Sequence, residues 1–294
     1  MARAHRTIGE RAFDLLNAAI MLLLVFVTLY PFVYVLFASV SDPARLVRHS
    51  GLMFWPQGWQ TMAYRLVFEN PMILIGYRNT LVYVVVGTTI NVVMTSLGAY
   101  ALSRKSFLIR NPVMLGITFT MFFSGGLIPL YLQVQRLGLT DKIWAMVIPN
   151  AMSAYNLIIM RTGFEAVPVS LEESAKLDGA RHLTIMTNIV LPLSTAVVAV
   201  MILFYGVGHW NAWFGAMIYL RTRDLYPLQL ILREILVSNM TDDMTAGGDV
   251  GMREAIGEAV KYATIIVATV PILAIYPFLQ RYFVKGVMLG AIKG

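Results

Sequence analysis

Long apolar stretches without charge alternate along this chain with shorter polar segments. Asp, Glu, Lys and Arg are all absent from residues 15–41, 79–103, 111–135, 143–160, 182–220 and 262–280. Each stretch comes near or exceeds the roughly 18 residues with which an α-helix crosses the apolar core of a bilayer. The pattern therefore predicts six transmembrane helices, at about 15–40, 79–103, 112–135, 143–161, 192–220 and 260–281.

Composition agrees with a membrane protein built as one domain. Hydrophobic residues make up 58% of the 294 residues, charged residues make up only 13%, and the mean hydropathy is +0.68. Soluble domains are far less apolar than this. Because the predicted helices and their connections leave no room for a separate globule, we expect one all-α membrane domain over 1–294.

Charge and motif content reduce the number of functional classes to which the chain can belong. The net charge of +7 comes from basic residues scattered between the apolar stretches, so a nucleic-acid surface is not expected. An ion-coupled transporter normally carries ionisable groups within its spans, and the apolar stretches contain no Asp, Glu, Lys or Arg. The sequence contains no Cys and no phosphate loop of the GxxxxGK(S/T) type. If ATP drives the protein, it is therefore hydrolysed on another chain.

An enzyme embedded in the membrane is the rival class. Its chemistry would need a metal pair, or a nucleophile beside a base. No HExxH motif is present, and the histidines are far apart in sequence, at His5, His49, His182 and His209. We therefore predict no catalytic residue and no metal ligand.

Residues 165–191 form a polar segment with helix signals of its own. Ser170 and Glu173 have the spacing of a capping box, and Gly179 can adopt the left-handed conformation that ends a short helix. We expect a first helix at about 171–178 and a second helix directly after the glycine. One face of the first helix would carry mostly small side chains, which suits docking on another protein. An ordinary loop between two spans is the alternative.

The same segment contains a spaced motif. Glu173, Ser174 and Ala175 are followed after three residues by Gly179, and after nine further residues by the run Ile-Val-Leu-Pro at 189–192. This spacing resembles the EAA loop of ABC importer permeases, with Ser174 where that family usually has Ala. In the family, the first helix of the loop sits in a cleft of the ATPase subunit. The resemblance implies ATPase-coupling roles for Glu172, Glu173, Ser174, Ala175, Asp178, Gly179 and Ala180.

A second resemblance covers nearly the whole chain. The C-terminal sequence QRYFVKGVMLGAIKG is similar to that of the carbohydrate branch of these permeases, in which such a tail enters the interface between two ATPase subunits. It implies ATPase contacts for Gly286, Gly290, Lys293 and Gly294, with a disordered basic tail as the alternative. The segments LFYGVGHWNAWFGAMIYL and LYPLQLILREIL further resemble permeases for polysaccharide fragments, including the alginate importer.

Together the resemblances imply a type I ABC importer permease fold and import of a sugar or oligosaccharide by alternating access. Alginate or another uronate oligosaccharide is the expected substrate, with neutral sugars as the alternative. The implied partners are an unlike second permease, an extracytoplasmic solute-binding protein and two ATP-binding subunits that hold ATP and Mg. No cofactor is expected on this chain. A polytopic membrane enzyme or a non-ABC transporter is the alternative function.

Basic residues indicate the orientation in the membrane. They are denser in the segments that lie in the cytoplasm when the N-terminus does. We therefore expect a multi-pass protein of the bacterial inner membrane with both termini cytoplasmic.

One candidate for sugar contact lies in the predicted fifth span. Tyr205, His209 and Trp213 recur every four residues and would share a helical face, with Trp210 and Asn211 turned away. Aromatic rings stack on the apolar faces of sugars, while His can bind their oxygens. Packing between helices is the alternative.

A second candidate lies in the predicted fourth span. Asn150, Tyr155 and Asn156 offer polar groups, and Pro149 beside Asn150 could bend the helix open. Hydrogen bonding between helices is again the alternative.

Overall fold

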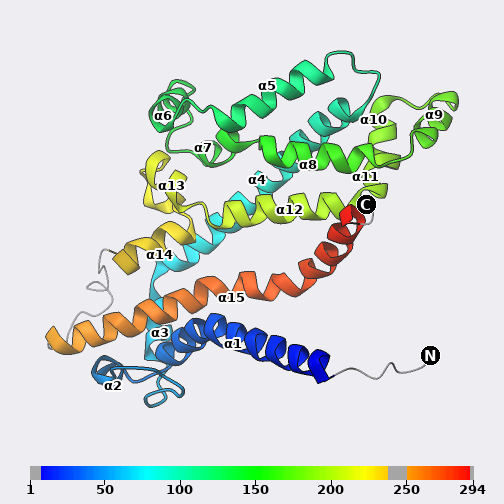
Figure 1. Ribbon diagram of the computed structural model, residues 1–294. Helices are drawn as coiled ribbons and strands as arrows, with labels where there is room; N and C mark the ends of the chain where they lie inside the picture. Colours follow the sequence, from blue (N-terminus) through cyan, green and yellow to red (C-terminus); the bar gives the residue numbers. More distant parts are fainter. Residues whose placement is uncertain (1–7, 238–249, 292–294) are drawn as a thin grey trace. The chain divides into compact units, whose positions relative to one another are not determined.

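The described part of the chain is helical throughout. The computed structural model describes residues 8–237 and 250–291, in which no strand occurs (Figure 1). The chain divides into two compact units, one of residues up to Asn70 with Glu234–Val270, the other of Pro71–Arg233 with the residues from Pro271 onward. The single membrane domain expected for 1–294 stays a prediction.

The first unit is built around one long apolar helix. Its elements are α1 (Ile8–Ser39), α2 (Pro43–Arg48), α3 (Met62–Glu69) and the first part of α15 (Val250–Ala291). Aromatic side chains join them, with the rings of Tyr34 and Tyr262 centred 6.0 Å apart. The most apolar part of α1 is not buried within the described structure, which suits contact with lipid.

The second unit contains the remaining elements, except for the part of α14 (Leu228–Val237) from Glu234 onward, which belongs to the first unit. Its helices up to α8 are α4 (Pro71–Ser103), α5 (Arg110–Phe122), α6 (Leu127–Arg136), α7 (Ile143–Val147), the 3₁₀ turn η1 (Ile148–Asn150) and α8 (Ala154–Glu165). The later elements are α9 (Val169–Leu177), α10 (His182–Ile185), the π-helical η2 (Met186–Val190), α11 (Leu191–Leu193), α12 (Thr195–Trp210), α13 (Trp213–Tyr219), η3 (Arg223–Leu225) and α14 (Leu228–Val237).

Helix α4 is the centre of the second unit. It packs against α8 and α12, and buried apolar side chains of all three helices form one core with those of α10 and η2. Glycine permits the closest approaches: a Cβ added at Gly87 on α4 would lie 2.3 Å from the His209 ring on α12. At Gly163 on α8, the added atom would lie 2.7 Å from Val197 on α12. Small residues at crossings of this kind let helix backbones pack tightly in membranes.

The predicted spans are present, but three of them are broken. Helices α1, α4 and the 255–274 part of α15 are each long and apolar enough to cross a membrane. The other three spans are bent pairs: α5 and α6 meet at 114°, α7–η1 and α8 at 56°, and the α10–α11 run and α12 at 87°. If each pair counts as one span, the described residues hold the six that the sequence predicts.

The breaks have local causes in the sequence. Gly126, between α5 and α6, has φ 84°, a conformation that glycine adopts without steric cost. Pro149 lies in the turn before the α8 break, where the sequence predicts a bend. The continuous helix expected over 192–220 is wrong, because α12 ends at Trp210 and α13 begins at Trp213.

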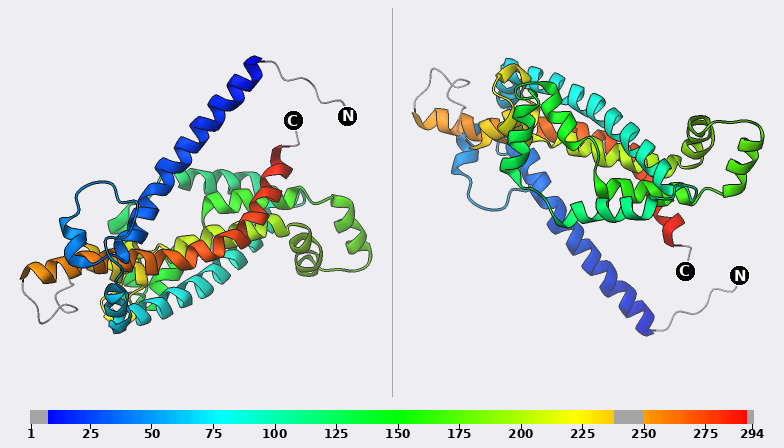
Figure 2. Two further views of the ribbon diagram at one scale, coloured as in Figure 1. Left: turned by 90° about the horizontal axis from the view of Figure 1, so that it is seen from below. Right: turned by 90° about the horizontal axis from the view of Figure 1, so that it is seen from above.

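The 165–191 segment forms the expected pair of helices. Helix α9 ends before Gly179, whose φ of 81° is the predicted left-handed conformation. The capping box is wrong: the helix already begins at Val169, directly after Pro168, so Ser170 lies inside it and caps nothing. The views in Figure 2 show α9 and α10 projecting beyond the end of α8.

Candidate functional site

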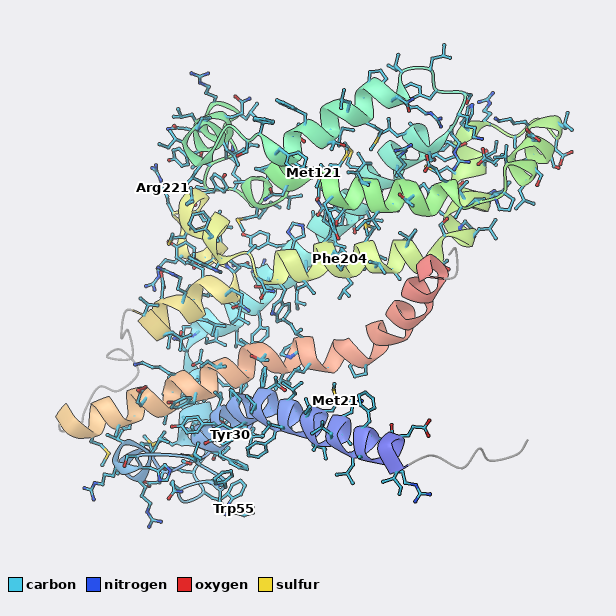
Figure 3. The ribbon with its side chains drawn as sticks, viewed as in Figure 1. Met21, Tyr30, Trp55, Met121, Phe204 and Arg221 are labelled. Atoms are coloured by element: carbon cyan, nitrogen blue, oxygen red, sulfur yellow. The ribbon has the colours of Figure 1, made fainter. Side chains whose placement is uncertain are left out.

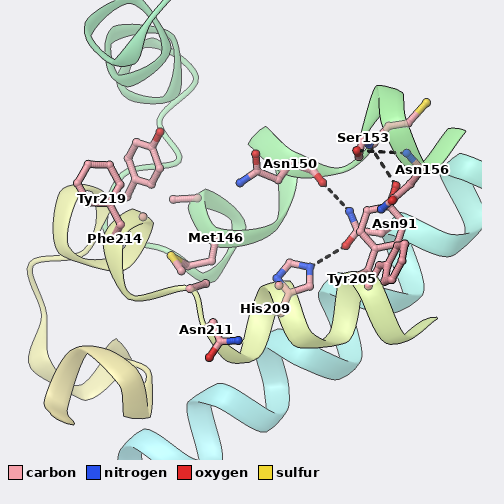
Figure 4. Close-up of a pocket in the computed structure, with 16 residues that line it drawn as sticks. Asn91, Met146, Asn150, Ser153, Asn156, Tyr205, His209, Asn211, Phe214 and Tyr219 are labelled. Carbon is pink, nitrogen blue, oxygen red and sulfur yellow. Dashed lines mark hydrogen bonds between the residues drawn. The ribbon is translucent and has the colours of Figure 1, made fainter. Parts of the chain in front are cut away.

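A cavity of about 530 Å³ lies within the second unit (Figure 4). This volume is within the usual range for small-molecule sites. Its walls come from α4, α7, η1, the start of α8, the end of α12, and α13. The lining residues are Asn91, Ala145, Met146, Asn150, Met152, Ser153, Asn156, Phe204, Tyr205, Gly208, His209, Asn211, Ala212, Phe214, Gly215 and Tyr219. Amide, hydroxyl and aromatic groups dominate, and Asp, Glu, Lys and Arg are absent from this lining.

Asn91 organises the polar wall of the cavity. The residue is fully buried in the middle of α4, and its amide nitrogen donates to the Asn150 carbonyl at 2.5 Å. Its amide oxygen lies 2.6 Å from His209 Nε2. Because this oxygen can only accept, His209 Nε2 donates to it. The dashed lines in Figure 4 trace both bonds.

Tyr205 ties three helices together beside this network. Its hydroxyl is 2.7 Å from Thr95 Oγ1 on α4 and accepts a hydrogen bond of 3.1 Å from the Ser153 backbone N–H. Ser153 is also the N-cap of α8, where its side chain accepts from the Asn156 N–H. The aromatic group therefore holds the wall in place and presents only part of its ring to the cavity.

The structure brings together four of the six residues predicted to contact sugar. Asn150, Asn156, Tyr205 and His209 all line the cavity, although they come from two different segments. The Pro149 bend opens the chain beside Asn150, as expected.

The other two predicted residues do not line this cavity. Tyr155 is 56% exposed and does not line the cavity. Trp213 does not share a face with His209, because the helix ends between them; its ring instead lies 4.9 Å from the Arg233 guanidinium carbon. Asn211, which a continuous helix would turn away, lines the cavity.

Sequence reasoning missed Asn91 and the aromatic side chains Phe204 and Tyr219. Phe204 extends from α12, where Figure 3 labels it. An Asn in the middle of an apolar run is itself a signal, since a polar group at that depth needs a partner. The pattern does not say which helix supplies that partner.

The predicted ATPase-coupling residues divide between two faces of the 165–191 segment. Glu173, Ser174, Asp178 and Gly179 are exposed, and exposed apolar side chains of α9, with Leu177 at 90%, accompany them. Ala175 and Ala180 are half-buried against the core of the second unit. Glu172 is 3% exposed and faces the chain's own interior. Of the predicted tail contacts, Gly286 and Gly290 lie in α15, whereas Lys293 and Gly294 lie outside the described residues.

Asp141 fixes the loop before α7 to the loop after α13. Its carboxylate accepts from the Thr222 hydroxyl at 2.6 Å and from the backbone N–H groups of Thr222 and Arg221 at 2.8 Å each. The hydroxyl bond, followed by the backbone bonds, holds the pKa of Asp141 below its usual value. The clasp fixes one end of the cavity walls, because α7 and α13 both line the cavity.

Comparison with known proteins shows the family. Residues 73–289 match the family described as "Binding-protein-dependent transport system inner membrane component". The polygalacturonan/rhamnogalacturonan transport system permease protein YtcP of Bacillus subtilis (strain 168) is 40% identical over 97% of this chain and 99% of its own length. Protein LplC of the same organism is 38% identical over 99% of this chain and 98% of its own length.

A solved structure agrees in fold. The crystal structure of a bacterial ABC transporter involved in the import of the acidic polysaccharide alginate matches with a TM-score of 0.87. The match has 30% sequence identity and covers 96% of this chain and 100% of the other. Family, relatives and fold agree, and the chain belongs to the binding-protein-dependent inner-membrane transport components, as a carbohydrate ABC importer permease with the type I fold.

Proposed function

We propose that the chain forms half of the translocation pathway for an acidic oligosaccharide, such as a fragment of alginate or another uronate polymer. Transport is by alternating access, driven by ATP hydrolysis on separate subunits. The observation that carries the proposal is the cavity, where four Asn side chains and a His face aromatic groups without an intervening charge. Amides both donate and accept, so they can bind hydroxyl and carboxylate oxygens, while Phe and Tyr rings cover apolar sugar faces.

An excess of basic residues in segments that precede or follow the cavity-lining elements favours an anionic substrate. The segments 71–80, 133–142 and 220–233 contain six basic residues and two acidic ones. Lys142 immediately precedes α7, and exposed Arg221, labelled in Figure 3, follows cavity-lining Tyr219 by two residues. Asp141, one of the acidic residues, is already engaged by Thr222 and the Arg221 backbone. Charge of one sign around a neutral cavity raises the local concentration of oppositely charged ligand.

The exposed side of α9 supports an ATPase contact. Glu173, Ser174 and Asp178 are accessible there beside apolar Leu177, and the left-handed Gly179 fixes the turn that follows. In this proposal two ATP-binding subunits hold ATP and Mg, one of them receives α9, and the C-terminal tail contacts both. An unlike permease completes the cavity, and an extracytoplasmic binding protein delivers the sugar.

The substrate proposal is tested on the complex purified through a tag on this chain and placed in liposomes. Uronate oligosaccharides are expected to stimulate ATP hydrolysis more strongly than neutral ones of equal length. Raising the salt from about 0.1 M to about 1 M shortens the Debye length from about 10 Å to about 3 Å, so the stimulation by uronates is expected to weaken. Arg221→Gln is expected to flatten this salt dependence, whereas Arg110→Gln, at the start of α5, serves as the control. Stronger stimulation by neutral sugars, independent of salt, would contradict the proposal.

The orientation is tested by cysteine labelling, which has no native background in this chain. Cysteine placed at exposed Ser106 or Ser174 is expected to react with an impermeant maleimide only in inverted vesicles. Cysteine at exposed Ser50 is expected to react in intact cells after the outer membrane is made permeable. Reaction of the Ser174 variant in such cells would place α9 outside and overturn the proposed ATPase contact.

A further inference from the structure

A buried ion pair links the end of α4 to α9. Arg104 directly follows the last residue of α4, and its guanidinium pairs with the Glu172 carboxylate. The two side chains are 11% and 4% exposed. Buried charges of this kind contribute little net stability relative to apolar groups of similar shape, but they fix the position of the elements that carry them.

Arg104 also binds the end of α8 and the last residue of α4. Its Nη2 donates to the Phe164 carbonyl on α8 at 2.8 Å, and its Nε donates to Ser103 Oγ at 3.0 Å. The guanidinium carbon lies 5.1 Å from the centre of the Tyr100 ring on α4. The hydroxyl of Tyr100 is in turn 3.1 Å from His182 Nδ1 on α10. One guanidinium therefore joins α4, α8 and α9, and its aromatic neighbour adds α10.

The same helix reaches the cavity. Asn91 lies on the uninterrupted helix α4, 13 residues before Arg104, which directly follows the helix; at 1.5 Å per residue the separation is about 20 Å. Helix α4 thus carries the ion pair near one end and the central hydrogen-bonding residue of the cavity farther along. Along the chain, α9 is also connected to the cavity through α8, whose start lines it, and through η2 and the 87° bend before α12.

We propose that Arg104 is a positioning residue that, through Glu172, makes α9 and α4 move as one body, so that a displacement of α9 reaches Asn91 and the cavity. The inference rests on the proposed function, in which an ATPase subunit displaces α9. It assigns Glu172 to the inner side of α9, whereas Glu173 and Ser174 belong to the side that meets the ATPase.

The test follows movement at the cavity without using any sugar. A cysteine at Ala212, a small lining residue, reports whether the cavity is open to a maleimide before and after ATP and vanadate are added to the tagged complex. In the otherwise unchanged chain the nucleotide is expected to change the labelling rate. If the labelling rate of this chain does not change, the proposed alternating access fails. If it changes here and also in the variants, only the ion-pair inference fails.

Glu172→Gln and Arg104→Gln are each expected to reduce the nucleotide-dependent change about fivefold or more, the lower end of typical coupling between distant sites. The ATPase subunits are expected to copurify still, and the double variant should be no worse than either single one, because the residues act as a pair. Glu69→Gln is the control: it breaks the 2.7 Å pair with Arg65 within α3, which involves neither Arg104 nor α9.

A chain with two substitutions tests whether a lost response is due only to misfolding. Arg104→Met combined with Glu172→Leu keeps the site filled but removes the charged bonds that fix its geometry. This chain is expected to assemble with its ATPase and still lack the nucleotide response. A normal response in the assembled double variant, or an equal loss in the Glu69→Gln control, would overturn the inference.

Discussion

Replacement of Asn91 by Leu is expected to remove most of the response to sugar while the chain still inserts into the membrane. The change leaves the His209 Nε2–H and the Asn150 carbonyl without their partner, in a site where Asn91 is fully buried. An unsatisfied buried polar group costs roughly 1 to 3 kcal/mol, and about 1.4 kcal/mol is tenfold in affinity. The sugar concentration for half-maximal ATPase stimulation is therefore expected to rise about tenfold or more.

Asn79→Leu is the matched control for this variant. Asn79 lies on the same helix and donates to the carbonyls of Asp224 and Tyr226 at 2.7 and 3.0 Å, but it does not line the cavity. Its loss is expected to lower thermal stability in detergent by a similar amount without changing the concentration dependence of stimulation. Equal effects of the two variants on that dependence would mean that Asn91 only holds helices together.

Gly179→Val is expected to have the second large effect, a loss of coupling between ATP hydrolysis and transport. At φ 81° a residue with a β-carbon is strained, by roughly 1 to 2 kcal/mol and more when it is β-branched. Among the described residues other than its chain neighbours, no atom lies within 4 Å of the added carbon, so backbone strain is the direct penalty of a β-carbon there. Relieving it would turn α9 relative to α10, which follows the glycine.

Two substitutions separate backbone strain from a change of surface at Gly179. Asn adopts the left-handed conformation readily, so Gly179→Asn is expected to retain most of the sugar-stimulated ATPase activity that Val removes. Gly116→Val, on α5 with equally open space and no positive φ, is expected to behave as the unchanged chain. If Asn is as damaging as Val, glycine is needed at this position for the exposed surface and not for the left-handed turn.

The positions of the helices could be predicted from the sequence, but their breaks could be predicted only in part. A charge in the hydrocarbon core is costly, and this cost confines the charged residues to the segments between the spans. Whether an apolar run stays straight depends on single residues such as Gly126, whose left-handed backbone separates α5 from α6. The interruption after Trp210 has no Pro within it, so the periodic pattern continues through a place where the helix stops.

The same reasoning explains which cavity residues were found. Asn150 and Asn156 stand beside a predictable bend, and Tyr205 and His209 are one helical turn apart. A helix continued past Trp210 would place Trp213 on the same face as His209, but α12 ends at Trp210. Asn91 was missed because its partners are 59 and 118 residues away, and a single sequence does not state which helices adjoin.

The interruptions in α7–η1–α8 and α12–α13 have a consequence for how this transporter can change its specificity. Both lie at the cavity wall, at residues 151–153 and 211–212. Peptide groups released from helical bonding are tolerated at membrane depth where they line a cavity or find protein partners. Here most of the N–H groups already have partners: that of Ser153 donates to the Tyr205 hydroxyl, and those of Asn211 and Ala212 donate to the Val207 and His209 carbonyls. Substitution of Tyr205 would therefore leave a main-chain group of the wall without its partner, so an apolar lining side chain such as Phe214 is freer to diverge toward new sugars.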